Sequence, residues 1–181
     1  MAIRKIELYG SPVLRERCAT VAEITPDIQT LMDDMVETMR HARGAGLAAP
    51  QVGVPVRVMI VDLGAHAEKE HLVFFVNPEF VSKAGEMTGE EGCLSIPLIY
   101  EKLKRPAKVR ISALDGKGKS FEIEGEEFLS KAICHEMDHL DGVLFIDHLS
   151  TLRRDMAKRK IKKLIRDGEW DDPYPMATRE G

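Results

Sequence analysis

The first amphipathic pattern in the chain spans residues 26–43. Residues 25–27, Thr-Pro-Asp, supply a hydroxyl for an N-cap, a proline whose missing N–H costs nothing there, and an acid beside the helix dipole. Apolar residues then recur at spacings of three and four until two glycines end the pattern: Ile28, Leu31, Met32, Met35 and Met39. We therefore expect a helix with one buried face, followed by a loop or tight turn over residues 44–51.

Runs rich in β-branched and aromatic residues occupy positions 56–63 and 72–76, with a polar connection at 64–70 between them. Each run predicts a strand. Apolar residues also alternate with polar ones on both sides of residues 115–118, Asp-Gly-Lys-Gly: Val109, Ile111, Phe121 and Ile123. That arrangement predicts a β-hairpin, because such turn residues favour the backbone angles of a tight connection.

Two more helices are expected, at residues 126–140 and 150–166. The apolar positions of the second are taken to be Leu152, Met156, Leu164 and Ile165. Strands and helices without regular alternation indicate an α+β fold, with mixed or antiparallel strands packed around a central helix and with N-terminal and C-terminal helices. Residues 1–168 fit a single domain, and the proline-containing residues 169–181 look like an irregular tail.

The composition is that of an ordinary globular protein. Among 181 residues, 44% are hydrophobic and 31% charged, which excludes collagen-like, mucin-like and wholly disordered chains. The 3 cysteines are an odd number, which favours free thiols in a reducing compartment over a disulfide framework. No secretory signal or membrane-spanning stretch is evident, so we expect a cytoplasmic protein that does not enter the membrane.

The strongest chemical signal is residues 135–139, His-Glu-Met-Asp-His, within the second predicted helix. His135 and His139 lie four residues apart and so share one helix face, where both imidazoles can reach one metal ion. Glu136 then lies at the edge of that site, near a bound water, as in a metal-assisted hydrolase. The pattern also arises by chance, and the alternative is a solvated charged helix face.

A catalytic site of this type needs a third ligand and an open position for water. In the metzincin spacing the third histidine would fall at position 145, which is Phe145, and His148 comes three residues too late. The remaining candidate lies upstream, in residues 91–95, where Cys93 follows a glycine that permits close backbone approach. An HExxH-type zinc peptidase with another downstream ligand remains an alternative, as does a closed structural metal site.

Three separate segments together resemble the peptide deformylase family. The family motif G-x-G-x-A-A-x-Q stands at residues 44–51, E-G-C-L-S at 91–95, and H-E-x-D-H-L-x-G at 135–142. Their order and separation are also similar to the family's, over most of the chain. The resemblance implies a catalytic deformylase domain over residues 1–168 that hydrolyses the N-formyl-methionyl end of nascent peptides to formate and a free amine.

The resemblance implies that Cys93, His135 and His139 hold one divalent ion. The family works with Fe²⁺, and the donor set would also accept Zn²⁺, Ni²⁺ or Co²⁺. Glu136 would be the general base that takes a proton from the attacking water and passes it to the leaving amine. Cys134 points away from His135 on the helix, and it and Cys18 are expected to be bystanders.

The resemblance further implies that the Gln51 side-chain amide and the Leu94 backbone N–H stabilise the developing oxyanion. Gly46, which lacks a Cβ, would let the substrate backbone pair with its segment. The methionine side chain needs an apolar pocket, for which we name four candidates: Ala45, Leu94, Phe128 and Ala132. For Phe128 ordinary core packing is an equal alternative, and the stem of Lys131 would line the pocket if it points inward.

Two further features of the sequence concern charged residues. Glu91 would be costly to bury beside a metal site without a cation, so we expect an ion pair with Arg105 that stiffens the Cys93 loop. Residues 150–166 carry eight basic side chains against one acid, Asp155. This helix is either a solvated face or, given the family's work at the ribosome, a ribosome-docking surface. We expect a monomer.

Overall fold

The computed structural model describes residues 2–62, 72–170 and 173–174. Within them lie three α-helices: α1 (Pro26–His41), α2 (Glu127–Leu140) and α3 (Thr151–Arg166). Short 3₁₀ turns lie at Pro12–Arg15, Ala49–Val52 and Phe145–His148. None of the helices in this part of the chain is long and apolar enough to cross a bilayer.

Seven strands form two antiparallel sheets in the described residues. The larger sheet has the order β1-β2-β3-β6-β7, and the smaller one is the two-stranded ribbon β4-β5. The bounds of the strands are β1 Gly46–Ala48, β2 Val58–Asp62, β3 Leu72–Ala84, β4 Met87–Cys93, β5 Ile96–Arg105, β6 Lys108–Leu114 and β7 Ser120–Glu126.

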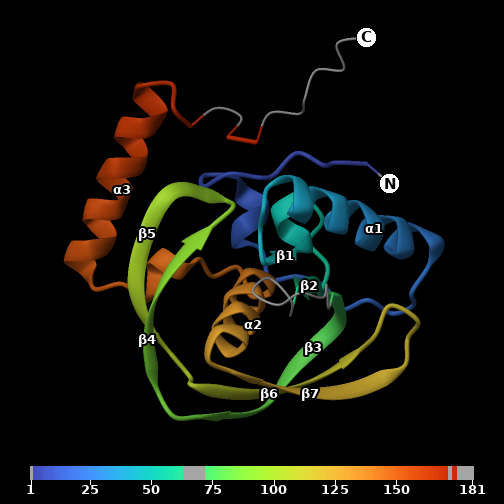
Figure 1. Ribbon diagram of the computed structural model, residues 1–181. Helices are drawn as coiled ribbons and strands as arrows, with labels where there is room; N and C mark the ends of the chain where they lie inside the picture. Colours follow the sequence, from blue (N-terminus) through green and yellow to red (C-terminus); the bar gives the residue numbers. More distant parts are fainter. Residues whose placement is uncertain (1, 63–71, 171–172, 175–181) are drawn as a thin grey trace.

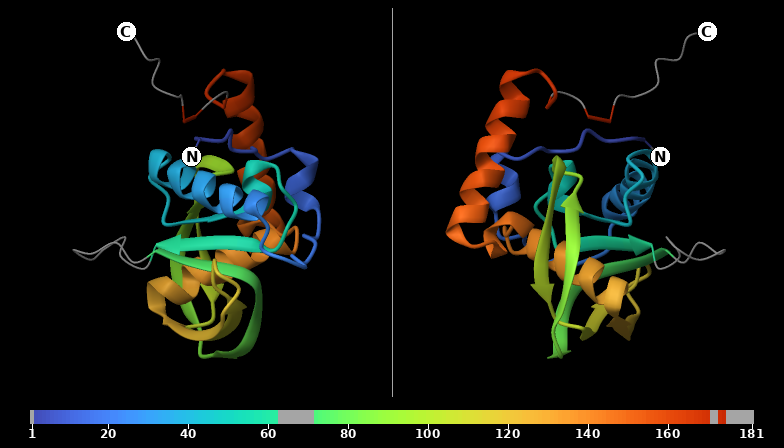
Figure 2. Two further views of the ribbon diagram at one scale, coloured as in Figure 1. Left: turned by 90° about the vertical axis from the view of Figure 1, so that its right-hand side faces the viewer. Right: turned by 60° about the vertical axis from the view of Figure 1, so that its left-hand side comes forward.

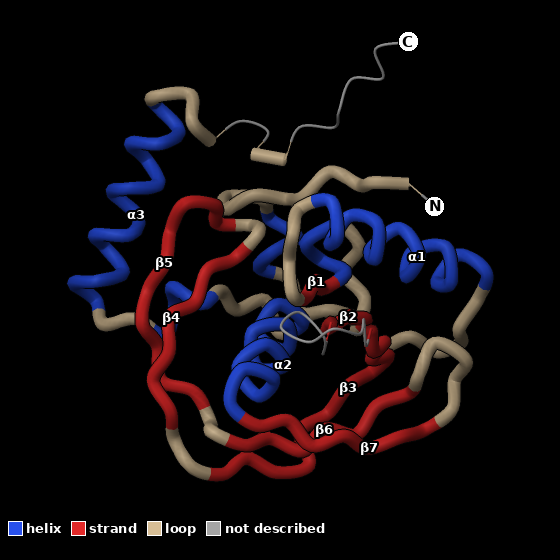
Figure 3. The backbone as a smooth tube through the Cα atoms, in the orientation of Figure 1, coloured by secondary structure: helices blue, strands red, loops and turns tan. Residues whose placement is uncertain are grey.

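Helix α2 lies at the centre of the molecule (Figure 1). It packs against β1, β2 and β7 of the larger sheet on one side and against β5 on the other. Helix α3 lies outside β5, and α1 covers β1 and β2, as the turned views and the backbone tube also show (Figures 2 and 3). The α+β class and the arrangement around a central helix are therefore confirmed.

Helix α1 has both the N-cap and the buried apolar face that the sequence predicts. The Thr25 hydroxyl accepts a hydrogen bond from the Ile28 N–H, as an N-cap does. Four of the five predicted apolar positions are buried, and Ile28 is partly buried. The predicted hairpin is also present, because β6 and β7 pair on either side of residues 115–118.

Several sequence-based expectations need correction. Residues 44–51 are more than a loop, because β1 pairs with β2 there, with Gly46 opposite Val61. Strand β3 extends well beyond residue 76, past two register shifts that break its alternation. The ribbon β4-β5 was not predicted at all, since glycines interrupt β4, and β5 contains a proline followed by Leu98 at a positive φ of 63°.

The buried face of α3 also differs from the prediction. Leu152, Met156 and Ile165 are exposed, whereas Leu164 is buried together with two residues that the prediction omitted, Ala157 and Ile161. Positions 157, 161 and 164 are also spaced by four and three, so periodicity permits either face. The position of β5, which α3 covers, decides between them.

Of the predicted tail and connection, residues 64–70, 171–172 and 175–181 lie outside the described part of the chain. Trp170 is only 5% exposed and belongs to the core cluster beneath α3. His148 ends the 3₁₀ turn Phe145–His148 instead of starting the last helix.

Candidate metal centre

Three side chains that the sequence singled out meet at the middle of α2. The ligand atoms of Cys93, His135 and His139 all lie within 4.8 Å of one another. Cys93 comes from the end of β4, and its Sγ lies 3.2 Å from Nε2 of His139. A thiolate and two imidazoles converging in this way fit a tetrahedral transition-metal site with one position left open. The residues present therefore suit a divalent ion.

A buried carboxylate orients the first histidine. Oε2 of Glu91 lies 3.1 Å from Nδ1 of His135, so it can accept the Nδ1–H and leave Nε2 for a metal ion. Arg105 donates to both oxygens of the same carboxylate, at 2.8 and 3.0 Å, and both partners are buried. The expected Glu91–Arg105 ion pair is confirmed. Burial opposes ionisation of Glu91, but the bonds from His135 and Arg105 prevail and lower its pKa to about 2.

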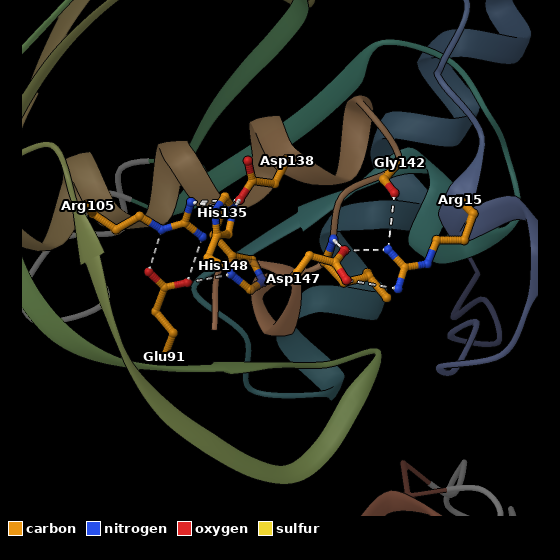
Figure 4. A network of polar contacts seen from close by, with 9 residues as sticks. Arg15, Glu91, Arg105, His135, Asp138, Gly142, Asp147 and His148 are labelled. Carbon is orange, nitrogen blue, oxygen red and sulfur yellow. Dashed lines mark hydrogen bonds and ion pairs between the residues drawn. The ribbon is translucent and has the colours of Figure 1, made fainter. Parts of the chain in front are cut away.

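The ion pair is part of a wider polar network (Figure 4). Arg105 also donates to Oδ2 of Asp138, at 2.7 Å, and the same oxygen lies 2.7 Å from Nε2 of His148. From the sequence, His148 is considered only as a possible metal ligand, and Asp138 has no expected role. Asp138 stands within the HExDH motif, and that fixed position was the available signal.

Glu136 lies in a different environment from Glu91. Its side chain is buried, and its Oε2 has no hydrogen-bond partner among the described residues. Burial raises the pKa of this carboxyl to about 7. A Cβ added at Gly46 would lie 2.6 Å from Oε1 of Glu136, so only glycine lets β1 pass this close to the carboxylate.

Gln51 is held so that its amide nitrogen faces the centre. Its Oε1 accepts a hydrogen bond from the Ala48 N–H at 2.8 Å, which fixes the orientation of the amide. Its Nε2 then lies 3.6 Å from Sγ of Cys93 and donates to Oγ of Ser95 at 3.2 Å. The amide N–H₂ group is therefore available close to the three metal-ligand candidates.

A cleft of about 740 Å³ opens above these side chains. Its lining includes Cys93, His135, Glu136 and Gln51. The predicted pocket residues also lie along it: Ala45, Gly46, Leu94, Phe128 and Ala132.

The rim of the cleft holds residues that the sequence analysis left undecided or missed. Lys131 lines it, and the Lys131 ammonium group donates to the Glu90 carbonyl at 2.8 Å. Pro173 and Tyr174, from the predicted tail, line it as well. No sequence signal distinguished them, because Tyr174 reaches the cleft through a tertiary contact with Leu94, which lies 80 residues earlier in the chain.

The other two thiols differ from Cys93. Cys18 and Cys134 are both buried, and burial raises the pKa of each to about 11. A thiol of high pKa is a poor nucleophile and a poor ligand at neutral pH. Neither belongs to the cluster of candidate ligands found in the described residues.

The fold and the Cys-His-His cluster beside a buried glutamate define a metallohydrolase. The sequence pattern of the family described as polypeptide deformylase matches residues 3–155, and the chain belongs to that family. It is an enzyme that removes formyl groups from formyl-methionyl peptides. The zinc peptidase alternative is not favoured.

Curated relatives and solved structures agree over nearly the whole chain. A peptide deformylase of Alkalilimnicola ehrlichii is 48% identical over 168 residues, covering 93% of this chain and 94% of that one. One from Acidobacterium capsulatum is 45% identical, covering 94% and 100%. The crystal structure of a peptide deformylase from Legionella pneumophila has a TM-score of 0.86 at 45% identity, covering 93% and 98%. A deformylase from Ehrlichia chaffeensis, in complex with actinonin, has a TM-score of 0.85 at 32% identity, covering 92% and 99%.

Replacing Arg105 tests the buried ion pair. Arg105→Gln leaves Glu91 buried without its cation, so we expect a loss of about 3–5 kcal/mol in the free energy of unfolding. Metal affinity should also fall, because the Glu91 contact with His135 loosens. Urea denaturation and metal analysis check the two effects. Lys104→Gln, which removes the exposed neighbouring pair with Glu86, is the matched control and should change neither. Unchanged stability and metal content in Arg105→Gln would contradict the idea.

Proposed function

We propose that the enzyme hydrolyses the N-formyl-methionyl end of nascent polypeptides to formate and a free amino terminus, with one divalent ion held by Cys93, His135 and His139. The observation that supports this most is the convergence of their three ligand atoms within 4.8 Å, beside a buried carboxylate. The catalytic domain is taken as residues 1–168, followed by an irregular tail at 169–181 that packs back on the domain through Trp170 and Tyr174. We expect a cytoplasmic monomer.

The chemistry of the donor set limits the choice of ion. A thiolate and two neutral imidazoles suit Fe²⁺, Zn²⁺, Ni²⁺ and Co²⁺ alike. We favour Fe²⁺ because the family uses it. When bound, the ion acts as a Lewis acid and brings the pKa of a coordinated water toward neutrality.

Side chains and backbone groups of the chain transfer the proton and stabilise the developing oxyanion. Glu136 takes the proton of the attacking water at its unpartnered Oε2 and later delivers a proton to the leaving amine. The Nε2–H₂ of Gln51 and the backbone N–H of Leu94 donate to the formyl oxygen as it becomes negative. Each such donor is worth about 3 kcal/mol of barrier.

The geometry also suggests how the peptide binds. Strand β1 is at the edge of its sheet, so one side of its backbone is available to pair with an extended substrate. Gly46 carries no side chain to block that approach. The methionine side chain would enter the apolar part of the cleft lined by Ala45, Leu94, Phe128 and Ala132, with the stem of Lys131 at its rim.

Replacing Glu136 tests the proposed base. Glu136→Gln keeps the shape of the side chain but cannot accept the proton, so formate release from formyl-Met-Ala-Ser should fall at least about 100-fold. Metal content, measured on the same preparation by elemental analysis, should stay unchanged. Full activity with metal bound would sink the proposed role.

Replacing Cys93 tests its proposed role as a ligand, and replacing Cys134 is the matched control. Cys93→Ser should abolish binding of stoichiometric Zn²⁺ or Ni²⁺, because it replaces the thiolate with a hydroxyl. Cys134→Ser, one residue before His135, should retain the metal. A Cys93→Ser protein that still binds one equivalent tightly would require another third ligand and revive the peptidase alternative.

The basic face of α3 is proposed to dock on the ribosome. Arg159, Lys162 and Lys163 are solvent-facing on this helix, and reversing all three to Glu should weaken co-sedimentation with ribosomes. The loss should be greatest at low salt, because contacts with RNA phosphates release counterions. Reversal of Lys117 and Lys119 on the β6-β7 hairpin controls for added negative charge at a surface away from α3. Equal binding by wild type and the α3 variant would leave the helix as a solvated face.

A further inference from the structure

The chain beyond α3 returns to the cleft. At the end of α3 it turns at Gly168, whose φ is 75° and whose N–H donates to the Ile165 carbonyl at 3.2 Å. The Trp170 side chain is then buried in a core cluster that includes Ile96 and Ile99 of β5. This anchor holds the segment close to the β4-β5 turn, and Figure 1 shows residues 173–174 above the N-terminal coil, between α3 and α1.

Tyr174 connects two segments that both line the cleft. Its hydroxyl donates to the backbone carbonyl of Leu94, on the β4-β5 turn, at 3.2 Å. Its own backbone carbonyl lies 3.3 Å from Nε2 of His41, the last residue of α1, and accepts from the Nε2–H tautomer. One residue therefore joins the end of α1 to the turn that follows Cys93.

Three polar groups of the β4-β5 turn have hydrogen-bond partners. Oγ of Ser95 accepts from Nε2 of Gln51, and the Ser95 carbonyl accepts from the Tyr9 N–H at 2.8 Å. The carbonyl of Leu94 is held by Tyr174. The Leu94 carbonyl belongs to the peptide group after Leu94 and the Leu94 N–H to the one before, so the two groups share the Leu94 Cα. Holding the carbonyl therefore fixes that Cα and limits displacement of the N–H attached to the same residue.

The Tyr174 hydroxyl keeps its proton and can therefore always donate a hydrogen bond. The residue is partly buried at the cleft, and burial raises its pKa to about 12. It therefore remains protonated at any pH at which the enzyme would be assayed. Its contact with Leu94 does not depend on ionisation.

We propose that Tyr174 is a positioning residue for deformylation: by holding the Leu94 carbonyl, it keeps the Leu94 N–H directed at the formyl oxygen. The role rests on the proposed function of Leu94 as an oxyanion donor. It acts through Leu94 and requires no contact between Tyr174 and the reacting atoms. Because the oxyanion forms only on the way to the product, the effect should fall on turnover and not on substrate binding.

Tyr174→Phe removes the hydroxyl and keeps the ring. With the Fe²⁺ enzyme and formyl-Met-Ala-Ser under anaerobic conditions, we expect kcat to fall roughly three- to tenfold, as for loss of one hydrogen bond, with KM unchanged. Tyr9→Phe keeps the backbone N–H that bonds to the Ser95 carbonyl and removes only a hydroxyl of a residue outside the cleft lining, so it should match wild type. Melting temperature and metal content of all three proteins check that fold and loading are preserved.

A second readout is independent of turnover. In Zn²⁺-loaded protein, the ¹H–¹⁵N resonance of Ser95 reports on the peptide group that contains the held carbonyl, and that of Leu94 on the preceding peptide group. Both should shift in Tyr174→Phe and not in Tyr9→Phe. A Tyr174→Phe enzyme with wild-type kcat, or one in which only KM rises, would overturn the positioning role. Wild-type protein that releases no formate would instead refute the proposed function, while the resonances would still test the contact.

Discussion

The site depends on the contacts that the buried Glu91 carboxylate makes with His135 and Arg105. The carboxylate joins the strand that carries Cys93 to the helix that carries His135 and His139, through its 3.1 Å contact with His135. A buried negative charge needs a buried cation, and Arg105 provides it in bidentate form. Because Arg105 also binds Asp138 on α2, a single guanidinium fixes both the carboxylate and the helix. The ring orientation of His135 follows from this arrangement.

The same contact matters for the fold because the β4-β5 ribbon shares no ladder with the larger sheet. Apolar packing holds it in place: Ile96, Ile99 and Leu103 join the core cluster that contains Phe145 and Ile146. Packing of this kind is non-directional and tolerates small shifts. Hydrogen bonds to fixed charges do not, so the Glu91–Arg105–Asp138 network sets where Cys93 lies relative to α2.

The sequence predicted the local elements and the residues of the site better than it predicted which helix and strand faces pack against each other. The cap at Thr25 and the apolar stripe of α1 are local properties, and the side chains of the three motifs converge as expected. The β4-β5 ribbon was missed because glycines and a proline interrupt its alternation. The buried face of α3 was misassigned because its periodicity allows two faces, and only the position of β5 selects Ile161 over Met156. Tyr174 gave no signal, since its contact with Leu94 spans 80 residues.

The contrast between Glu91 and Glu136 explains why one fold can give two buried carboxylates opposite properties. Glu91 has a cation and a histidine, so its pKa falls to about 2 and it stays a fixed anion. Glu136 keeps an oxygen without a partner, and burial raises its pKa to about 7. Leaving a buried polar atom without a partner costs folding stability, so this carboxyl lowers the stability of the fold. A carboxyl that can both take and return a proton near neutral pH is what the proposed base requires, and the missing side chain of Gly46 leaves room for it.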